Sequence, residues 1–267
     1  MAGDKRVLIV GGGGREHALA TALKKSPQVG EIFCSPGNAG IASMATCVDI
    51  NDGVQGLARW AEENRIDLTV VGPEAELAVG IADIFAARGL TLFGPSRAAA
   101  ALETSKVFAK EFMARHGIPT AAYQVFSDYG QALDYLARQS FPLVIKADGL
   151  AAGKGVTVAD NLEEAQGALE AMMVEGIFGE AGSQVVIEEF LPGEEATLLV
   201  FTDGEQILPM PSAQDHKRIG EGDTGPNTGG MGAYSPTRVL TPSLEEKVME
   251  TIVRPTIEGM AREGRPY

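Results

Sequence analysis

Short apolar runs that end at glycine or proline alternate with helical stretches through the first hundred residues. The expected strands are 6–10, 31–34, 68–71 and 90–93, and the expected helices between them are 16–25, 57–64 and 75–88. Short apolar strands separated by helices are typical of a parallel sheet that is buried on both faces. The sequence therefore predicts an α/β fold that begins with an open parallel sheet, with helices on both faces.

Glycine and polar residues follow three of these strands, at 11–15, 35–40 and 72–76. Open α/β sheets bind ligands at the carboxyl ends of their strands. The first segment fails the dinucleotide pattern G-x-G-x-x-G, because Glu16 or His17 stands where the third glycine is needed. A glycine turn before a helix, with Arg15 beside it, favours a phosphate monoester instead. The alternative is a tight structural turn.

The pattern changes after the expected helix 104–116, which Gly117 ends, and a linker at 118–120. Closely spaced strands then suggest an α+β arrangement, with a hairpin turn at Asp203-Gly204. A polar loop without regular structure is expected at 215–236. The other expected elements are strands 143–147, 155–158, 185–189, 196–202 and 206–209 and helices 129–139, 161–175 and 243–262.

The loop from Gly149 to Gly155 joins two of these strands. It differs from a phosphate-binding Walker A loop, since it is one residue short and has glycine in place of Ser or Thr. A glycine loop between two antiparallel strands can still cover a triphosphate. Lys146 lies on the preceding apolar strand, and we expect its partner to be a phosphate rather than a carboxylate. The alternative is a strand lysine that extends into solvent.

Two further segments concentrate charged residues. Four carboxylates flank the Pro-Gly turn at 192–193, where backbone and carboxylate groups could bind adenine and ribose; the alternative is a solvated acidic hairpin. The segment 215–218 reads Asp-His-Lys-Arg and is followed by five glycines within 222–232. This mixture favours a loop that binds an anion or substrate, and the alternative is a flexible linker.

Charge and hydropathy exclude several classes of partner. Lys and Arg number 22 against 36 Asp and Glu, so the formal net charge is −14. Such a chain repels polyanions, which disfavours nucleic acid as its main partner. No apolar stretch approaches the roughly 20 residues of a membrane span, and the run from Val7 to Val10 is too short for a signal peptide. We therefore expect a cytoplasmic protein with no membrane partner.

Taken together, these segments resemble the glycinamide ribonucleotide synthetase family of ATP-grasp ligases. The resemblance implies that ATP drives ligation of glycine to 5-phosphoribosylamine through glycyl phosphate, a step of purine biosynthesis, with Mg²⁺ or Mn²⁺ as cofactor. It also implies an N-terminal domain over 1–120 and ATP-grasp subdomains over 121–191 and 192–267. The segments, in order, are GGGGREHAL, SPGNAG, VGPEAELAVG, LETSK, VIKADGLAAGKGV, VIEEFLPGEE and QDHKRIGEGDTGPNTGGMGAYSP.

The resemblance also assigns roles to individual residues. The residues implied to bind ATP are Lys106, Lys146, Gly149, Gly153, Lys154, Gly155, Glu188, Glu189, Phe190, Leu191 and Glu195. Those implied to hold the sugar phosphate are Gly13, Gly14, Arg15, Glu16, Gly37, Asn38 and Glu74. Those implied to line the junction of glycine and sugar are Asp215, Lys217, Arg218, Asn227, Thr228, Gly229, Gly230 and Met231. Catalysis is expected to depend on Lys146, Asp215, Lys217 and Arg218.

One part of the family pattern has no counterpart here. The family supplies a Glu and an Asn from a later strand to hold magnesium, and a C-terminal domain follows. We therefore expect an N-terminal fragment whose metal ligands would lie beyond Tyr267, and name no metal ligand within it. The alternative is a non-catalytic nucleotide-binding module. The sequence leaves the oligomeric state open.

Overall fold

The structure is a computed structural model that describes residues 3–151, 154–222 and 224–267. It contains two compact units, Met1–Ala101 and Leu102–Tyr267. Helix α6 (Lys106–Arg115) lies in the second unit, where Lys110 forms an ion pair with Glu188 on a strand. The expected domain boundaries at residues 120 and 191 stay predictions.

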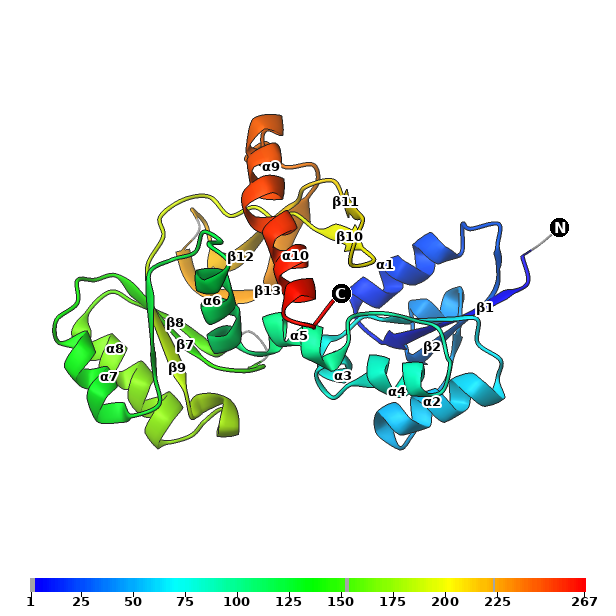
Figure 1. The fold of residues 1–267 in the computed structure, drawn as a ribbon, viewed down its shortest axis with the longest axis horizontal. Helices are drawn as coiled ribbons and strands as arrows, with labels where there is room; N and C mark the ends of the chain where they lie inside the picture. The colour runs from blue at the N-terminus through cyan, green and yellow to red at the C-terminus, as the bar shows by residue number, and fades with distance from the viewer. Residues whose placement is uncertain (1–2, 152–153, 223) are drawn as a thin grey trace. The chain divides into compact units, whose positions relative to one another are not determined.

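The first unit is a five-stranded parallel sheet in the order β3-β2-β1-β4-β5. Its early strands and helices, from β1 and α1 to α4, are drawn in blue to cyan (Figure 1). Side chains of α2 and α4 pack with Leu8, Val10 and Phe33 on one face, while Ala20 of α1 packs with Val7 and Ile9 on the other. The expected parallel sheet with helices on both faces is thus confirmed. The bounds are β1 Lys5–Gly11, α1 Gly14–Leu23, β2 Val29–Pro36, η1 Ile41–Ser43, β3 Thr46–Cys47, α2 Gly53–Glu63, β4 Leu68–Val71, α3 Glu74–Ala78, α4 Ile81–Ala87, β5 Leu92–Phe93 and α5 Arg97–Thr104.

The helix expected over 75–88 is instead two helices, α3 and α4. Gly80 separates them with φ of +87°, a left-handed conformation that glycine adopts without steric cost. Helix α5 was not expected, and it ends directly before Ser105, which caps α6. The sequence indicated a helix that begins at residue 104, but in the structure α5 ends at Thr104 and α6 begins at Lys106.

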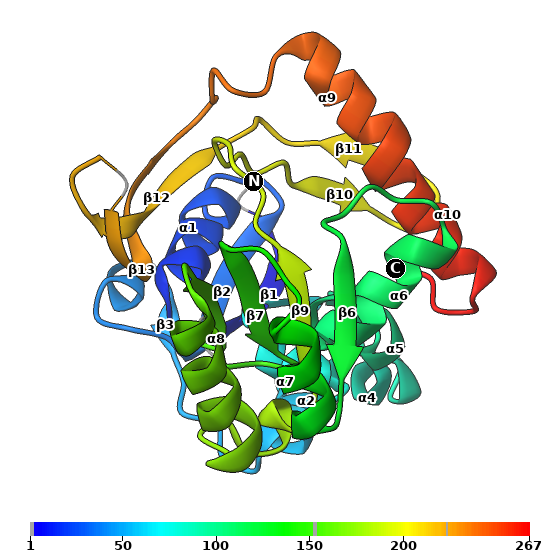
Figure 2. The same cartoon turned by 90° about the vertical axis from the view of Figure 1, so that its left-hand side faces the viewer.

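The second unit contains a four-stranded antiparallel sheet in the order β6-β9-β7-β8. Helices α7 and α8 cover one face of this sheet (Figure 2). Their apolar side chains pack with Leu143, Ile145 and Ile187. The sequence did not predict β6. The bounds are β6 Tyr123–Phe126, α7 Tyr129–Leu136, β7 Leu143–Ala147, β8 Val156–Ala159, α8 Leu162–Leu169, η2 Glu170–Val174, η3 Gly179–Gly182 and β9 Val185–Glu189.

Two hairpins follow this sheet. Strands β10 (Val200–Thr202) and β11 (Ile207–Pro209) pair around Asp203-Gly204, which confirms the expected turn. Strands β12 (Gln214–Gly220) and β13 (Thr224–Tyr234) pair antiparallel, so the expectation of an irregular loop at 215–236 is wrong. The polar, glycine-rich sequence carries little strand propensity, and cross-strand hydrogen bonds supply the order instead.

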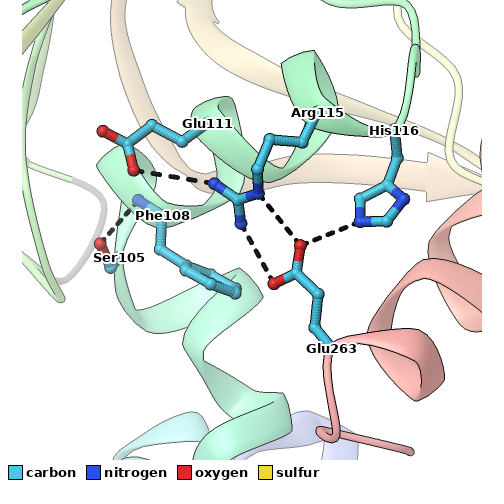
Figure 3. Close-up of polar contacts among 6 residues, drawn as sticks. All are labelled: Ser105, Phe108, Glu111, Arg115, His116 and Glu263. Carbon is cyan, nitrogen blue, oxygen red and sulfur yellow. Dashed lines mark hydrogen bonds and ion pairs between the residues drawn. The ribbon is translucent and has the colours of Figure 1, made fainter.

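A helical run closes the chain, as expected. It consists of α9 (Pro242–Val248), the π-helical turn η4 (Met249–Val253) and α10 (Arg254–Arg262). Glu263, just after α10, accepts hydrogen bonds from Arg115 at 3.0 and 3.1 Å and lies 2.9 Å from Nε2 of His116 (Figure 3). These contacts attach the end of the helical run to α6. Among the described residues, no helix is both long and apolar enough to cross a membrane.

The contacts of Glu263 predict that part of the stability of the fold is lost at acidic pH. The hydrogen bond from Arg115, followed by that from His116, lowers the pKa of Glu263 below its ordinary value of 4.5. A carboxylate with a lowered pKa stabilises the fold above its unfolded pKa, and that contribution is lost as the pH falls through the folded value. Glu263→Gln should therefore cost about 1 kcal/mol of unfolding free energy at pH 7 and a smaller amount at pH 3, measured with urea.

A control lies on the same helical run. Glu258 pairs with Arg262 at 2.7 Å in an exposed i,i+4 arrangement, so Glu258→Gln should change stability little at either pH. An equal loss for both variants at pH 7 would contradict a special role for Glu263.

Candidate functional site

The glycine turn after β1 is organised by a buried carboxylate. Helix α1 begins at Gly14, and Glu16 in its first turn accepts a hydrogen bond from the Gly13 backbone N–H at 2.5 Å. Glu16 is only 5% exposed. A Cβ at Gly72 would overlap its Oε1, and one at Gly11 would lie 2.8 Å from its Cγ. Glycine at both positions therefore makes room for Glu16.

The other residues expected at this end lie around the same turn. Arg15 donates to the Gly72 carbonyl at 2.6 Å and lies 3.7 Å from Glu74. Asn38 donates to the Gly12 carbonyl at 2.8 Å, and the neighbouring Gly37 N–H donates to Gly11 at 3.2 Å. The structure thus gathers the predicted residues of the first unit at the carboxyl ends of β1, β2 and β4. Helix N-terminal N–H groups beside an exposed Arg15 suit an anion.

A cavity of about 550 Å³ opens at the same ends of the strands. Its lining includes Ser35, Pro36, Asp52 and Glu76. None of the sugar-phosphate residues named from the sequence lines it. The sequence offered no signal for this cavity, because α2 and α3 form its walls only once the sheet has assembled.

In the second unit, Lys106 stands at the start of α6. Its Nζ donates to the Gly149 carbonyl at 2.9 Å, at the beginning of the glycine-rich loop. Burial is the main cause that lowers the pKa of Lys106, and the nearby Lys146 lowers it further, while Asp148 opposes both. A cation that is partly removed from water in this way gains from an added anionic partner.

Ser105 and Asp148 fix the start of α6. The Ser105 hydroxyl accepts from the Phe108 N–H at 3.0 Å (Figure 3) and donates to Asp148 at 3.2 Å. The other Asp148 oxygen accepts from the Val107 N–H at 3.1 Å. A side-chain cap and a carboxylate together satisfy the free N–H groups of the first turn. Sequence reasoning missed Asp148, which stands two residues after Lys146.

Lys146 forms an ion pair with the carboxylate of Glu188, and binding of a phosphate by this lysine stays a prediction. Our expectation that the partner would not be a carboxylate is therefore wrong. Strands β7 and β9 pair so that Lys146 lies opposite Val186, which places Glu188 on the same face, one diagonal step away. Because that pairing joins residues about forty positions apart, the local sequence did not reveal it.

The next three residues that the resemblance assigns to ATP, Glu189 to Leu191, are arranged differently from Glu188. Glu189 accepts from the Ala122 N–H at 3.1 Å and so holds β6 against β9. Phe190 and Leu191 are exposed after the end of β9. The carboxylate of Glu188 is therefore buried, whereas the apolar side chains of Phe190 and Leu191 are accessible to solvent. Binding of adenine by these residues stays a prediction.

The hairpin of β12 and β13 carries the second charged cluster. Lys217 forms an ion pair with Glu195 at 2.7 Å and lies 3.8 Å from Asp215. The hydrogen bond to Glu195 is the main cause that raises the pKa of Lys217. Glu195, which the resemblance assigns to ATP, is thereby joined to Asp215 and Lys217, which it assigns to the junction of glycine and sugar.

Side-chain hydrogen bonds to the backbone connect the two strands of the hairpin and its glycine-rich part. Arg218 donates to the Gly225 carbonyl at 3.3 Å, and Thr228 donates to the Lys217 carbonyl at 2.8 Å. The Thr228 hydroxyl also accepts from the Gly230 N–H at 3.0 Å, and Met231 is exposed. Gly229, which was also expected at the junction, lies between Thr228 and Gly230 on β13.

The glycine-rich loop after β7 is described only at its two ends. Ala147 donates to the Gly155 carbonyl at 2.8 Å, and Lys154 N–H donates to Ala151 at 2.9 Å. The expected connection between two antiparallel strands is confirmed. Gly153 and the side chain of Asn227 lie outside the described residues.

The described part of the chain holds no group of three or more His, Cys, Asp or Glu side chains that could bind a metal ion.

A parallel α/β unit, followed by an antiparallel sheet with two lysines beside a glycine-rich connection, defines a chain of the ATP-grasp class. Residues 5–103 match the family model of the phosphoribosylglycinamide synthetase N domain, and residues 104–267 match that of its ATP-grasp (A) domain. The chain belongs to the phosphoribosylglycinamide synthetase family, which confirms the resemblance seen in the sequence.

Individual relatives agree with this assignment. A phosphoribosylamine–glycine ligase from Vibrio parahaemolyticus is 55% identical over 265 residues, which are 98% of this chain and 62% of the relative. The crystal structure of phosphoribosylamine–glycine ligase from Thermotoga maritima has a TM-score of 0.81 and 36% identity, covering 98% of this chain and 63% of that one. A biotin carboxylase domain from Hydrogenobacter thermophilus shares the fold, with a TM-score of 0.76 at 18% identity, covering 96% of this chain and 58% of that one. This chain thus spans about three fifths of the length of its curated relatives.

Proposed function

We propose that this chain carries the sugar-phosphate and nucleotide sites of a ligase that joins glycine to 5-phosphoribosylamine. ATP is the energy source in this reaction, and ADP and phosphate are released. The observation that carries the proposal is the meeting of Lys106 and Lys146 at the start of the glycine-rich loop, in a chain of this family.

The lysines supply what phosphate binding requires. Coulombic attraction between unit charges is several times stronger near a partly buried site than in bulk water. Lys106 is held at the helix start by its bond to Gly149, and Lys146 extends from the strand that leads into the same loop. Both ammonium groups therefore approach the position where a phosphate chain would lie beneath the loop.

The first unit likewise offers hydrogen-bond donors and positive charge to the phosphate of a sugar phosphate. Backbone N–H groups at the start of α1 and the exposed guanidinium of Arg15 provide donors for a phosphate monoester. Asn38 and Glu74 lie at the same end of the sheet and supply polar groups for the amine and hydroxyls.

Magnesium is expected for the family, where it neutralises charge on the transferred phosphate. The described residues do not fit a metal site on their own, because their acids form no suitable cluster. No step is therefore assigned here to a protein-bound metal. The part of the chemistry that these residues can perform is to bind, orient and neutralise the two phosphate-bearing substrates.

Binding experiments test the proposal with the 267-residue chain. Ribose 5-phosphate and ATP should each bind in calorimetric titrations, whereas NAD should give no heat at the same concentrations. Arg15→Ala should weaken ribose 5-phosphate binding by about 10- to 150-fold, which corresponds to the loss of one charge-assisted hydrogen bond.

Lys25→Ala is the matched control, because Lys25 follows the opposite end of the same helix and is exposed. It should leave ribose 5-phosphate affinity unchanged. Binding of NAD in preference to the sugar phosphate would overturn the proposal for the first unit, and absence of ATP binding would overturn it for the second.

A further inference from the structure

Lys110 is a buried lysine that the proposed reaction does not use. It lies on α6, four residues after Lys106, and is only 8% exposed. Its ammonium group forms an ion pair with Oε2 of Glu188 and donates to the Thr120 hydroxyl at 2.7 Å. It also lies 5.6 Å from the centre of the Tyr123 ring, within the range of a cation–π contact.

Two oxygen partners, from Glu188 and Thr120, surround the Lys110 ammonium group, and the ring of Tyr123 lies beside it. Lys110 is therefore enclosed by partners from its own chain. Lys146 differs, because its side chain is 30% exposed and Glu188 is its ion-pair partner among the residues that the structure describes. Lys110 is therefore enclosed, whereas Lys146 is partly exposed to solvent.

Glu188 stands between the two lysines. Its side chain is 4% exposed, and its two oxygens are divided, with Oε1 toward Lys146 and Oε2 toward Lys110. A carboxylate buried to this degree needs a cation beside it, because an unpaired charge away from water is strongly unfavourable. Two lysines around one carboxylate leave one positive charge in excess.

We propose that Lys110 is a positioning residue that serves as the permanent counter-ion of Glu188 and so leaves Lys146 available to exchange the carboxylate for an ATP phosphate. The inference rests on the proposed function of the nucleotide site. Without Lys110, Lys146 would be the remaining ion-pair partner of Glu188 among the residues that the structure describes, and each transfer of Lys146 to phosphate would leave a buried carboxylate without an ion pair. Lys110 thus acts on the nucleotide through Glu188, without touching it.

A double-mutant cycle tests this coupling. ATP affinity would be measured by calorimetry for the full 267-residue chain, Lys110→Met, Glu188→Gln and the double variant. Lys110→Met should weaken ATP binding at least tenfold when Glu188 is present. In the Glu188→Gln background the same change should matter less than threefold, because there is no buried charge left to compensate.

Thr120→Val serves as the control for a purely structural effect. It removes a neutral partner of Lys110 while both lysines and Glu188 keep their charges. It should lower the urea midpoint of unfolding but leave ATP affinity within twofold of wild type. If Lys110→Met and Thr120→Val weaken ATP binding equally, the positioning role is wrong.

Unfolding midpoints give a second readout that needs no nucleotide. Lys110→Met should lower the midpoint when Glu188 is present and change it much less in the double variant, which contains no uncompensated carboxylate. Equal effects of Lys110→Met in both backgrounds, on affinity or on the midpoint, would overturn the inference alone. Absence of ATP binding by the wild-type chain would instead overturn the proposed function.

Discussion

Gly72→Ala should destabilise the first unit by about 2–4 kcal/mol. The new Cβ would overlap the carboxylate of Glu16, which is buried and bonded to the Gly13 backbone. Overpacking alone costs about 1–3 kcal/mol, and displacing a buried carboxylate from its donor adds to that loss. Urea unfolding of the single variant measures the effect.

The turn itself offers the matched control. A Cβ at Gly14 would meet nothing within 4 Å, so Gly14→Ala should leave the unfolding free energy unchanged or slightly raised. Because both glycines belong to the same end of the sheet, a general intolerance of alanine there would affect both. Equal destabilisation by the two substitutions would show that Glu16 is not the cause.

Lys146→Met should weaken ATP binding by about 10- to 150-fold, which corresponds to roughly 1.5–3 kcal/mol for a charge-assisted hydrogen bond. The side chain is partly exposed beside the glycine-rich loop, and methionine keeps its length while removing the charge. The Glu188 carboxylate keeps Lys110 as its partner in this variant, so the chain should still fold. Calorimetric titration with ATP measures the change, with circular dichroism as the check on folding.

Lys247→Met is the control for loss of a lysine elsewhere in the same unit. Lys247 is exposed on α9, and its replacement should leave ATP affinity unchanged. Retention of full ATP affinity by folded Lys146→Met would contradict the assignment of this lysine to a phosphate.

The order of elements could be read from local patterns. The apolar run of β1 and the strand that became β4 were predicted within one residue at each end, because buried parallel strands are short and flanked by glycine or helix. The turn at Gly204 followed from an Asp-Gly pair. The hairpin of β12 and β13 could not be read in this way, since its order comes from cross-strand bonds between residues with weak strand preference.

The candidate sites likewise contain some features that the local sequence predicted and others that depend on tertiary contacts. The glycine turn with Arg15 and the loop that follows Lys146 were recognisable because their residue types and order are local properties of the chain. The enclosure of Glu188 between Lys110 and Lys146 could not be recognised from the sequence. The spacing of Lys106 and Lys110 indicated that both lie on one face of a helix, but it did not indicate which carboxylate that face meets. Local sequence therefore determined which segments carry charge and glycine. Only the tertiary structure decided which charges neutralise each other, because strand register and helix packing bring together residues that the chain keeps far apart.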